Sequence, residues 1–168
     1  VGQAEFLRFA AVIDPIGHRL LSTNDTQVDG IIGYHCFREL LLTLDFPNQQ
    51  LILQRGALPE PDGQDILRLS PGKAEPELTV TVGQTEVELL IDSGSQNCVN
   101  SSEPIAKTFS FHAAPFERRI AIDNGVVSTY QARIQGKLVF GRHTVIDPII
   151  GWDAGTKARN LLGMKILK

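Results

Sequence analysis

Apolar and polar residues alternate in two neighbouring stretches near the middle of the chain. Every second position is apolar on both sides of Gly83: Leu78, Val80 and Val82 before it, and Val87, Leu89 and Ile91 after it. A period of two predicts a pair of β-strands with one face in the core. The second strand runs directly into Asp92-Ser93-Gly94. The pattern therefore places a carboxylate where a strand leaves the core.

Similar patterns elsewhere predict a mainly β fold. The expected strands are residues 5–13, 50–53, 78–82, 86–91, 118–122, 126–135, 137–140 and 143–146. Residues 35–42, 103–109 and 164–168 are expected to form short helices.

Asp92 has two interpretations at this point. Asp, Ser and Gly are common turn residues, so the triplet is first of all compatible with an ordinary turn at a strand end. Aspartate is also costly to bury without a partner and disfavours strands, which is compatible with a carboxylate held at the floor of a cleft.

The chain contains an internal repeat. Residues 11–17, Ala-Val-Ile-Asp-Pro-Ile-Gly, recur with one insertion as residues 144–151, and residues 31–37 are echoed by residues 161–167. The offset is 133 residues between Pro15 and Pro148, and 130 residues between Gly33 and Gly163. Two matches in the same order at nearly the same offset indicate two related lobes.

A stretch rich in proline and glycine lies between the repeated segments. Residues 57–76 contain Pro59, Pro61, Gly63, Pro71, Gly72 and Pro76, and such a density favours extended, exposed chain. We expect residues 1–56 to be the C-terminal half of a first lobe, residues 57–76 a linker and residues 77–168 a second lobe. Within the linker, residues 65–69 could form one short edge strand.

The ordered set of motifs resembles the retropepsin-like and pepsin-like aspartic peptidases. A lobe of that family has a strand hairpin, an Asp-Thr/Ser-Gly triplet, a flap hairpin, and a late hydrophobic-hydrophobic-Gly segment before a short helix. Residues 77–168 follow this order, with Asp92-Ser93-Gly94 as the triplet, Asp123-Asn124-Gly125 as the flap tip and Leu161-Leu162-Gly163 as the late segment. Residues 28–33 match the late segment of a preceding lobe.

The resemblance implies a retropepsin-like acid-protease β-barrel lobe with short helices, plus part of a preceding related lobe. It implies that Asp92, Ser93 and Gly94 are catalytic residues, with the Ser93 hydroxyl bracing the loop. It further implies that a flap containing Asn124, Gly125, Val126 and Val127 covers an extended peptide. In the family mechanism two aspartates share a proton and activate one water molecule, and no cofactor or metal is required.

The repeat extrapolates to a partner of Asp92 about 40 residues before Val1. We therefore expect the second aspartate to come from a preceding segment, from a separate chain, or from Asp92 of another copy in a homodimer. The repeat favours the first two sources over the homodimer.

Composition restricts the other classes of function. The sequence of 168 residues has 42% hydrophobic and 21% charged residues and a net charge of -3, which is ordinary for a folded domain. No run of basic residues predicts nucleic-acid binding, and no apolar stretch is long enough for a transmembrane helix. The expected partner is a peptide or protein substrate.

The cysteines and histidines give no metal-site pattern. Cys36 and Cys98 are the only cysteines, and two buried thiols are a better interpretation than a disulfide. The cellular compartment stays open, because the sequence is compatible with a secreted or periplasmic protein and with a cytoplasmic one.

Three hypotheses follow for the function. The first is an aspartic-type endopeptidase. The second is a peptide-binding or assembly module that keeps the fold and does not cleave, which is suggested by the single candidate carboxylate in the sequence. The third is a generic β barrel that matches the motifs by coincidence.

Overall fold

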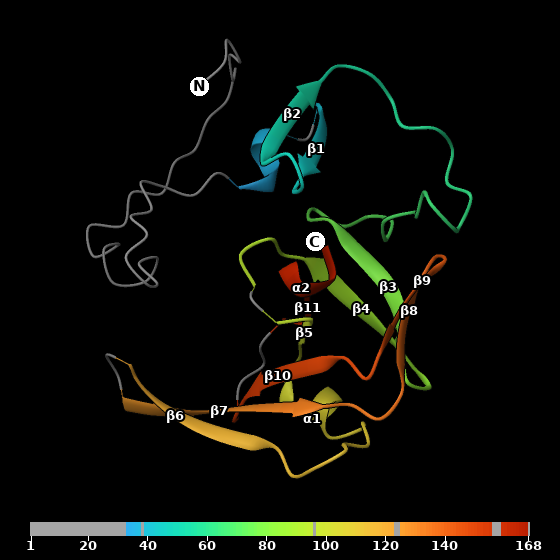
Figure 1. Ribbon diagram of the computed structural model, residues 1–168. Coiled ribbons are helices and arrows are strands. Elements are labelled where there is room, and N and C mark those ends of the chain that lie inside the picture. The colour runs from blue at the N-terminus through green and yellow to red at the C-terminus, as the bar shows by residue number, and fades with distance from the viewer. Residues whose placement is uncertain (1–32, 38, 96, 123–124, 156–158, 168) are drawn as a thin grey trace. The chain divides into compact units, whose positions relative to one another are not determined.

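The computed structural model describes residues 33–37, 39–95, 97–122, 125–155 and 159–167. The chain divides into two units, Val1–Leu58 and Pro59–Lys168 (Figure 1). The predicted strand at residues 5–13 and the first copy of the 11–17 repeat lie outside the described residues.

The described part of the first unit is a short hairpin. A 3-10 turn, η1 (Tyr34–Phe37), precedes strand β1 (Leu41–Asp45), which pairs antiparallel with β2 (Gln50–Gln54). The Asp45 carboxylate closes the connecting turn by accepting hydrogen bonds from the backbone N–H of Asn48 (3.1 Å) and from its side-chain amide (2.8 Å). The strand predicted at residues 50–53 is thus confirmed.

The helix predicted at residues 35–42 is wrong. The 3-10 turn ends at Phe37, and β1 begins at Leu41. A helix of two turns is marginal by itself, because nucleation is costly. The Asp45–Asn48 turn instead gives residues 41–45 a full set of cross-strand partners.

The second unit is built on one sheet of nine described strands, in the order β6-β7-β10-β5-β11-β4-β3-β8-β9. Their bounds are β3 (Glu77–Val82), β4 (Thr85–Ile91), β5 (Val99–Asn100), β6 (Phe116–Ile122), β7 (Gly125–Arg133), β8 (Lys137–Phe140), β9 (His143–Ile146), β10 (Ile149–Asp153) and β11 (Leu161–Leu162). The predicted strands from residue 78 onward are all present, which confirms a mainly β fold with short helices.

The β3–β4 hairpin supplies much of the hydrophobic core. The alternate residues Leu78, Val80, Val82, Val87 and Leu89 are all buried. The period of two in the sequence therefore marks the core-facing side of both strands. The two strands pair in antiparallel register from Glu77↔Leu90 to Val82↔Thr85.

Strand β11 lies between β4 and β5, which the loop containing Asp92 connects. It runs parallel to β4, with Leu161 paired to Leu90, and antiparallel to β5. The late segment of the chain thus fills the space between the two strands that flank the Asp92 loop.

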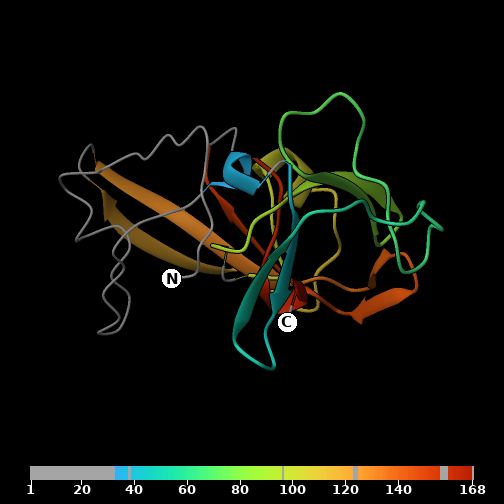
Figure 2. The same cartoon turned by 90° about the horizontal axis from the view of Figure 1, so that it is seen from above.

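The two ends of the sheet are hairpins of different length. Figures 1 and 2 show β6–β7 at one end and β8–β9 at the other. Strand β10 pairs with β7 along Thr129–Arg133, so among the described strands residues 125–127 of β7 pair with β6 alone.

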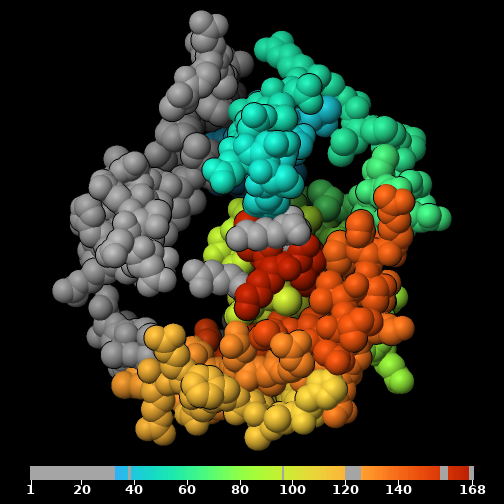
Figure 3. Space-filling view, viewed as in Figure 1, coloured from blue at the N-terminus to red at the C-terminus, as the bar shows by residue number. Residues whose placement is uncertain are grey.

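Two short helices complete the second unit: α1 (Glu103–Ala106) and α2 (Met164–Leu167). Both begin where predicted, and α2 follows β11 directly after Gly163. In Figure 3 its red atoms are visible at the surface near the orange atoms of β8 and β9. Among the described residues, no helix has the length and apolar character needed to cross a bilayer.

The edge strand predicted at residues 65–69 does not form. The Asp62 carboxylate accepts three backbone N–H groups, from Gln64 (2.7 Å), Asp65 (2.9 Å) and Ile66 (2.9 Å), and so folds this segment into a tight turn. These local bonds satisfy the backbone without a strand partner.

Candidate active site

Asp92 lies directly after β4, and three consecutive backbone N–H groups fix the end of that strand. Leu90 N–H donates to Asn160 O, Ile91 N–H to Pro76 O, and Asp92 N–H to Leu162 O, each at 2.9 Å. Asn160 O and Leu162 O belong to the segment on one side of the strand, and Pro76 O belongs to the segment on the other side. The backbone of Asp92 is therefore held from both sides.

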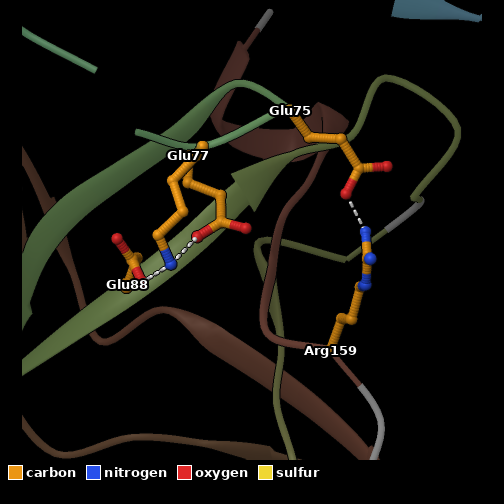
Figure 4. Close-up of polar contacts among 5 residues, drawn as sticks. Glu75, Glu77, Glu88 and Arg159 are labelled. Carbon is orange, nitrogen blue, oxygen red and sulfur yellow. Dashed lines mark hydrogen bonds and ion pairs between the residues drawn. The ribbon is translucent and has the colours of Figure 1, made fainter. Parts of the chain in front are cut away.

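Ion pairs reinforce the two flanking segments (Figure 4). Arg159 pairs with Glu75, which joins the residue before Pro76 to the residue before Asn160. Lys73 pairs with Glu77 (3.0 Å) and Glu88 (2.8 Å), and these two carboxylates raise the pKa of the Lys73 ammonium.

The Asp92 carboxylate is half-buried and is oriented by its own loop. Its Oδ1 accepts a hydrogen bond from Gly94 N–H (2.8 Å), and its backbone oxygen accepts one from Ser95 N–H (3.2 Å). Ser93 is exposed and makes no hydrogen bond to another described residue. The bracing seen within this unit thus comes from Gly94 and Ser95, and the bracing role of Ser93 stays a prediction.

Gly163 permits the close approach of the Asp92 loop to the start of α2. A Cβ at this position would lie 2.8 Å from both Ser95 O and Ser95 Oγ and would clash with Asn97 O. Met164 N–H donates to Ser95 O (2.8 Å) and Gly163 N–H to Cys98 O (2.9 Å). Only glycine fits without moving the loop.

The predicted flap residues belong to the β6–β7 hairpin. Gly125 is the first residue of β7 and pairs with Ile122, whereas Asn124 lies outside the described residues. Val126 is 66% exposed and Val127 is half-buried. The flap role of these residues stays a prediction.

Toward its base, the same hairpin carries a polar cross-strand contact. The Ser128 hydroxyl donates to the Glu117 carboxylate (2.7 Å). This bond, with a smaller contribution from Arg119, lowers the pKa of Glu117.

A hollow of about 500 Å³ lies between the base of this hairpin and the loop that follows Asp92. It is lined by Asn97, Asn100, Ser101, Phe116, Arg118, Thr129, Tyr130, Gln131, Gly151, Trp152, Asp153, Arg159 and Leu161. Neither Asp92 nor the two valines are part of this lining. The structure thus brings together the base of the hairpin and residues 97–101, rather than the hairpin tip and the carboxylate.

The polar lining of the hollow, including Asn97, Asn100 and Gln131, was not predicted from the sequence. Asn97 and Gln131 are 34 residues apart and meet only because β10 brings β7 next to β5. The spacing of the two asparagines, three residues apart just after the triplet, was the one signal available.

Trp152 forms part of the floor of the hollow. It is buried and stacks on Tyr130 and on Phe111, with ring centroids 5.5 Å apart in each pair. This position in the core agrees with the packing of aromatic residues in protein interiors.

The cysteines are free: Cys98 is buried and Cys36 is half-buried. No group of three His, Cys, Asp or Glu side chains suited to a metal ion occurs in the described part of the chain.

Comparisons with known proteins point to one family. Residues 78–166, more than half of the chain, match the family model described as aspartyl protease. A solved structure with some similarity is a retropepsin-like aspartic protease from Rickettsia conorii, with 15% sequence identity and a TM-score of 0.43 over 54% of this chain and 75% of that one. No curated protein matches the chain.

Proposed function

The chain belongs to the aspartyl protease family, and we propose that it acts as an aspartic-type endopeptidase in which Asp92 is one of two catalytic carboxylates. The family match runs from Leu78 in β3 to Ile166 in α2. This match makes the third hypothesis, a generic β barrel that carries the motifs by coincidence, the weakest of the three.

The observation that carries the proposal is the position of the Asp92 carboxylate. It follows a strand whose last backbone groups are bonded on both sides, and its Oδ1 is held by Gly94 N–H (2.8 Å). It is only half-buried, so a substrate or a second carboxylate can approach it. A fixed backbone with an accessible carboxylate suits general acid–base chemistry.

The proposed reaction requires a second carboxylate. Two carboxylates a few ångströms apart cannot both ionise easily and therefore share a proton. The ionised group accepts a proton from the water that attacks the scissile carbonyl, and the protonated group donates to the carbonyl oxygen. Asp92 alone cannot supply both functions.

We propose that the second carboxylate comes from another lobe. Asp92-Ser93-Gly94 is the one Asp-Ser/Thr-Gly triplet in the 168 residues. The other lobe would be a segment of the same polypeptide, a separate chain, or a second copy related by a two-fold axis. The exposed hydroxyl of Ser93 is available to contact such a lobe.

We also propose that the β6–β7 hairpin contacts the substrate. Within the described part of the chain, residues 125–127 pair with β6 alone, and a strand pair held on one side can bend toward a bound peptide. Gly125, Val126 and Val127, together with Asn124, would then cover an extended chain and exclude water.

The test compares a substitution at Asp92, directly after β4, with a substitution at Glu86, within β4. Asp92→Asn removes the proposed catalytic charge, and Glu86→Gln removes an exposed charge within β4. We expect cleavage of a mixed peptide library, followed by mass spectrometry, to fall by about 10²–10⁴-fold in Asp92→Asn and to stay unchanged in Glu86→Gln.

A binding measurement separates the enzyme from the non-catalytic module. The probe is a peptide in which a hydroxyl-bearing carbon replaces the scissile carbonyl. An enzyme should bind it more tightly than the parent peptide, because it mimics the tetrahedral intermediate. Equal binding of both peptides, without any cleavage by the unmodified protein assembled with the lobe that supplies the second carboxylate, would instead establish a peptide-binding module.

A further inference from the structure

Four polar side chains form a continuous line from the β6–β7 hairpin to the Asp92 loop. Gln131 Nε2 donates to Asn97 Oδ1 (2.6 Å), Asn97 Nδ2 donates to Asn100 Oδ1 (2.6 Å), and Asn100 Nδ2 donates to Ser95 Oγ (2.7 Å). We call Gln131, Asn97, Asn100 and Ser95 the amide relay. All three hydrogen bonds point in the same direction, toward the Asp92 loop.

The relay crosses the sheet over Gly151. Gln131 pairs with Gly151, and Gly151 pairs with Asn100, so the three residues form one row across β7, β10 and β5. Directly paired residues point to the same face of a sheet. A Cβ at Gly151 would lie 2.6 Å from Asn97 Nδ2 and 2.7 Å from Asn100 Oδ1. The absence of a side chain at position 151 leaves the space that the Asn97 amide fills.

Burial increases along the relay. Gln131 is exposed, Asn97 and Asn100 are half-buried, and Ser95 is buried. Each asparagine uses its oxygen to accept from one neighbour and its nitrogen to donate to the next. The relay thus joins an exposed side chain of β7 to a buried side chain of the Asp92 loop through an unbroken series of hydrogen bonds.

Ser95 connects the relay to the candidate catalytic residue. The backbone N–H of Ser95 donates to Asp92 O (3.2 Å), and the backbone oxygen of Ser95 accepts a hydrogen bond from Met164 N–H (2.8 Å). Gln131, Asn97 and Asn100 also line the hollow of about 500 Å³. A ligand in the hollow therefore touches the relay directly.

We propose that Gln131, Asn97 and Asn100 are positioning residues that couple the β6–β7 hairpin to the orientation of the Asp92 loop. When a peptide binds against the base of the hairpin, the relay holds Ser95, and through it Asp92, in the arrangement needed for catalysis. This inference rests on the proposed function, because a positioning role for the relay requires Asp92 to be catalytic.

The first experiment measures the coupling without any substrate. Gln131→Met removes the first donor at an exposed position and keeps a similar side-chain length. Gln135→Met changes an exposed glutamine just beyond β7 that makes no side-chain hydrogen bond to another described residue and serves as the matched control. The readout is amide hydrogen exchange of Ser95, measured by NMR on the 168-residue chain.

We expect the exchange rate of the Ser95 amide to rise by about 3–10-fold in Gln131→Met, since one hydrogen bond of ordinary strength is lost from the network. The rate should be unchanged in Gln135→Met. If Gln131→Met alters only the Asn97 side-chain resonances and leaves Ser95 at its original rate, the relay does not reach the loop and the inference is wrong.

The second experiment measures catalysis, using the single variants Gln131→Met and Ser95→Ala and the double variant. Positioning predicts a lower kcat with a nearly unchanged KM in Gln131→Met. In the double variant the two losses should not add, because both substitutions break the same line. Additive losses, or a change confined to KM, would contradict a positioning role.

The two experiments separate failure of the inference from failure of the proposed function. If the unmodified protein, assembled with the lobe that supplies the second carboxylate, cleaves no peptide, the proposed function fails and the catalytic part of the inference fails with it, whereas the exchange experiment still decides whether the hairpin and the loop are coupled. If cleavage depends on Asp92 but is insensitive to Gln131, only the inference fails.

Discussion

In the β3–β4 hairpin the alternate apolar residues from Leu78 to Leu89 are buried, whereas Phe116 and Val126 of the β6–β7 hairpin are 69% and 66% exposed. Both are antiparallel pairs of strands that follow one another in the sequence. The difference lies in their neighbours among the described strands: β4 is bordered by β3 and β11, but residues 125–127 of β7 are bordered by β6 alone.

The two proposed roles, of Asp92 and of the β6–β7 hairpin, place different demands on the same sheet. A strand with partners on both sides keeps its end in place, as a catalytic carboxylate requires. A hairpin with partners on one side opens at lower free energy, as a segment that closes over a substrate requires. The amide relay lies between these two regions.

The largest expected effect comes from truncating a side chain in each hairpin. Leu89 of β4 is fully buried, so Leu89→Ala should lower the free energy of unfolding by about 2–5 kcal/mol. Val126→Ala at the exposed tip should change it by less than about 0.5 kcal/mol. Urea denaturation checks both values. Similar losses for the two variants would remove the contrast between the hairpins.

The next effect concerns the contact between the Asp92 loop and α2. Gly163→Ala places a methyl group against Ser95 and should lower stability by about 1–3 kcal/mol. Gly33→Ala is the matched control, because a Cβ there meets no atom within 4 Å. Thermal unfolding of both variants provides the measurement, and a stable Gly163→Ala protein would show that the loop is loosely packed.

A smaller effect is expected at the Arg159–Glu75 pair beside Asp92. The two side chains are 65% and 35% exposed, so solvent screens their attraction. Glu75→Gln should therefore change stability by less than about 1 kcal/mol, and the change should shrink when salt is added. A larger loss, independent of salt, would mean that this pair and not the backbone bonds fixes the end of β4.

The smallest expected effect depends on pH and concerns the base of β7. Asp147 accepts a hydrogen bond from Gly136 N–H (3.0 Å) and pairs with His112 (3.0 Å), and these contacts lower the pKa of Asp147. A lowered pKa in the folded state favours the charged form. The stabilisation is thus complete above the unfolded pKa of about 3.9 and disappears as the pH falls through the lower folded pKa.

Asp147→Asn should accordingly be less stable than the unmodified protein at neutral pH, and the difference should close in acid, at a pH below the folded pKa of Asp147. Urea midpoints at the two pH values test this, with Glu86→Gln as a control that shows no difference at either. A stability difference that grows in acid would contradict a lowered pKa of Asp147 in the folded protein.

The sequence predicted the regular strands and the position of Asp92 because both follow from local patterns. Alternation identified β3 and β4, and the triplet after Ile91 marked the strand end. Strand β10 was missed because Ile150, Gly151 and Trp152 are buried in succession, so no alternation exists. Strand β11 has two residues, which is too short for any period.

The hollow and the amide relay depend on contacts between distant segments. Asn97 and Asn100 meet Gln131 only after β10 pairs with both β7 and β5. The sequence around Gly151 does not indicate that the absence of a side chain there makes room for the Asn97 amide. Such sites need the register of the whole sheet, which no single segment of sequence contains.

The most direct test of the central claim is the pH dependence of kcat/KM for peptide cleavage, in the unmodified protein and in Asp92→Asn. A pair of carboxylates that shares a proton predicts a bell-shaped profile for the unmodified protein. It also predicts that Asp92→Asn loses activity at every pH, while Glu86→Gln keeps the full profile. An Asp92→Asn protein that retains the bell-shaped profile and most of its activity would show that Asp92 is not a catalytic residue.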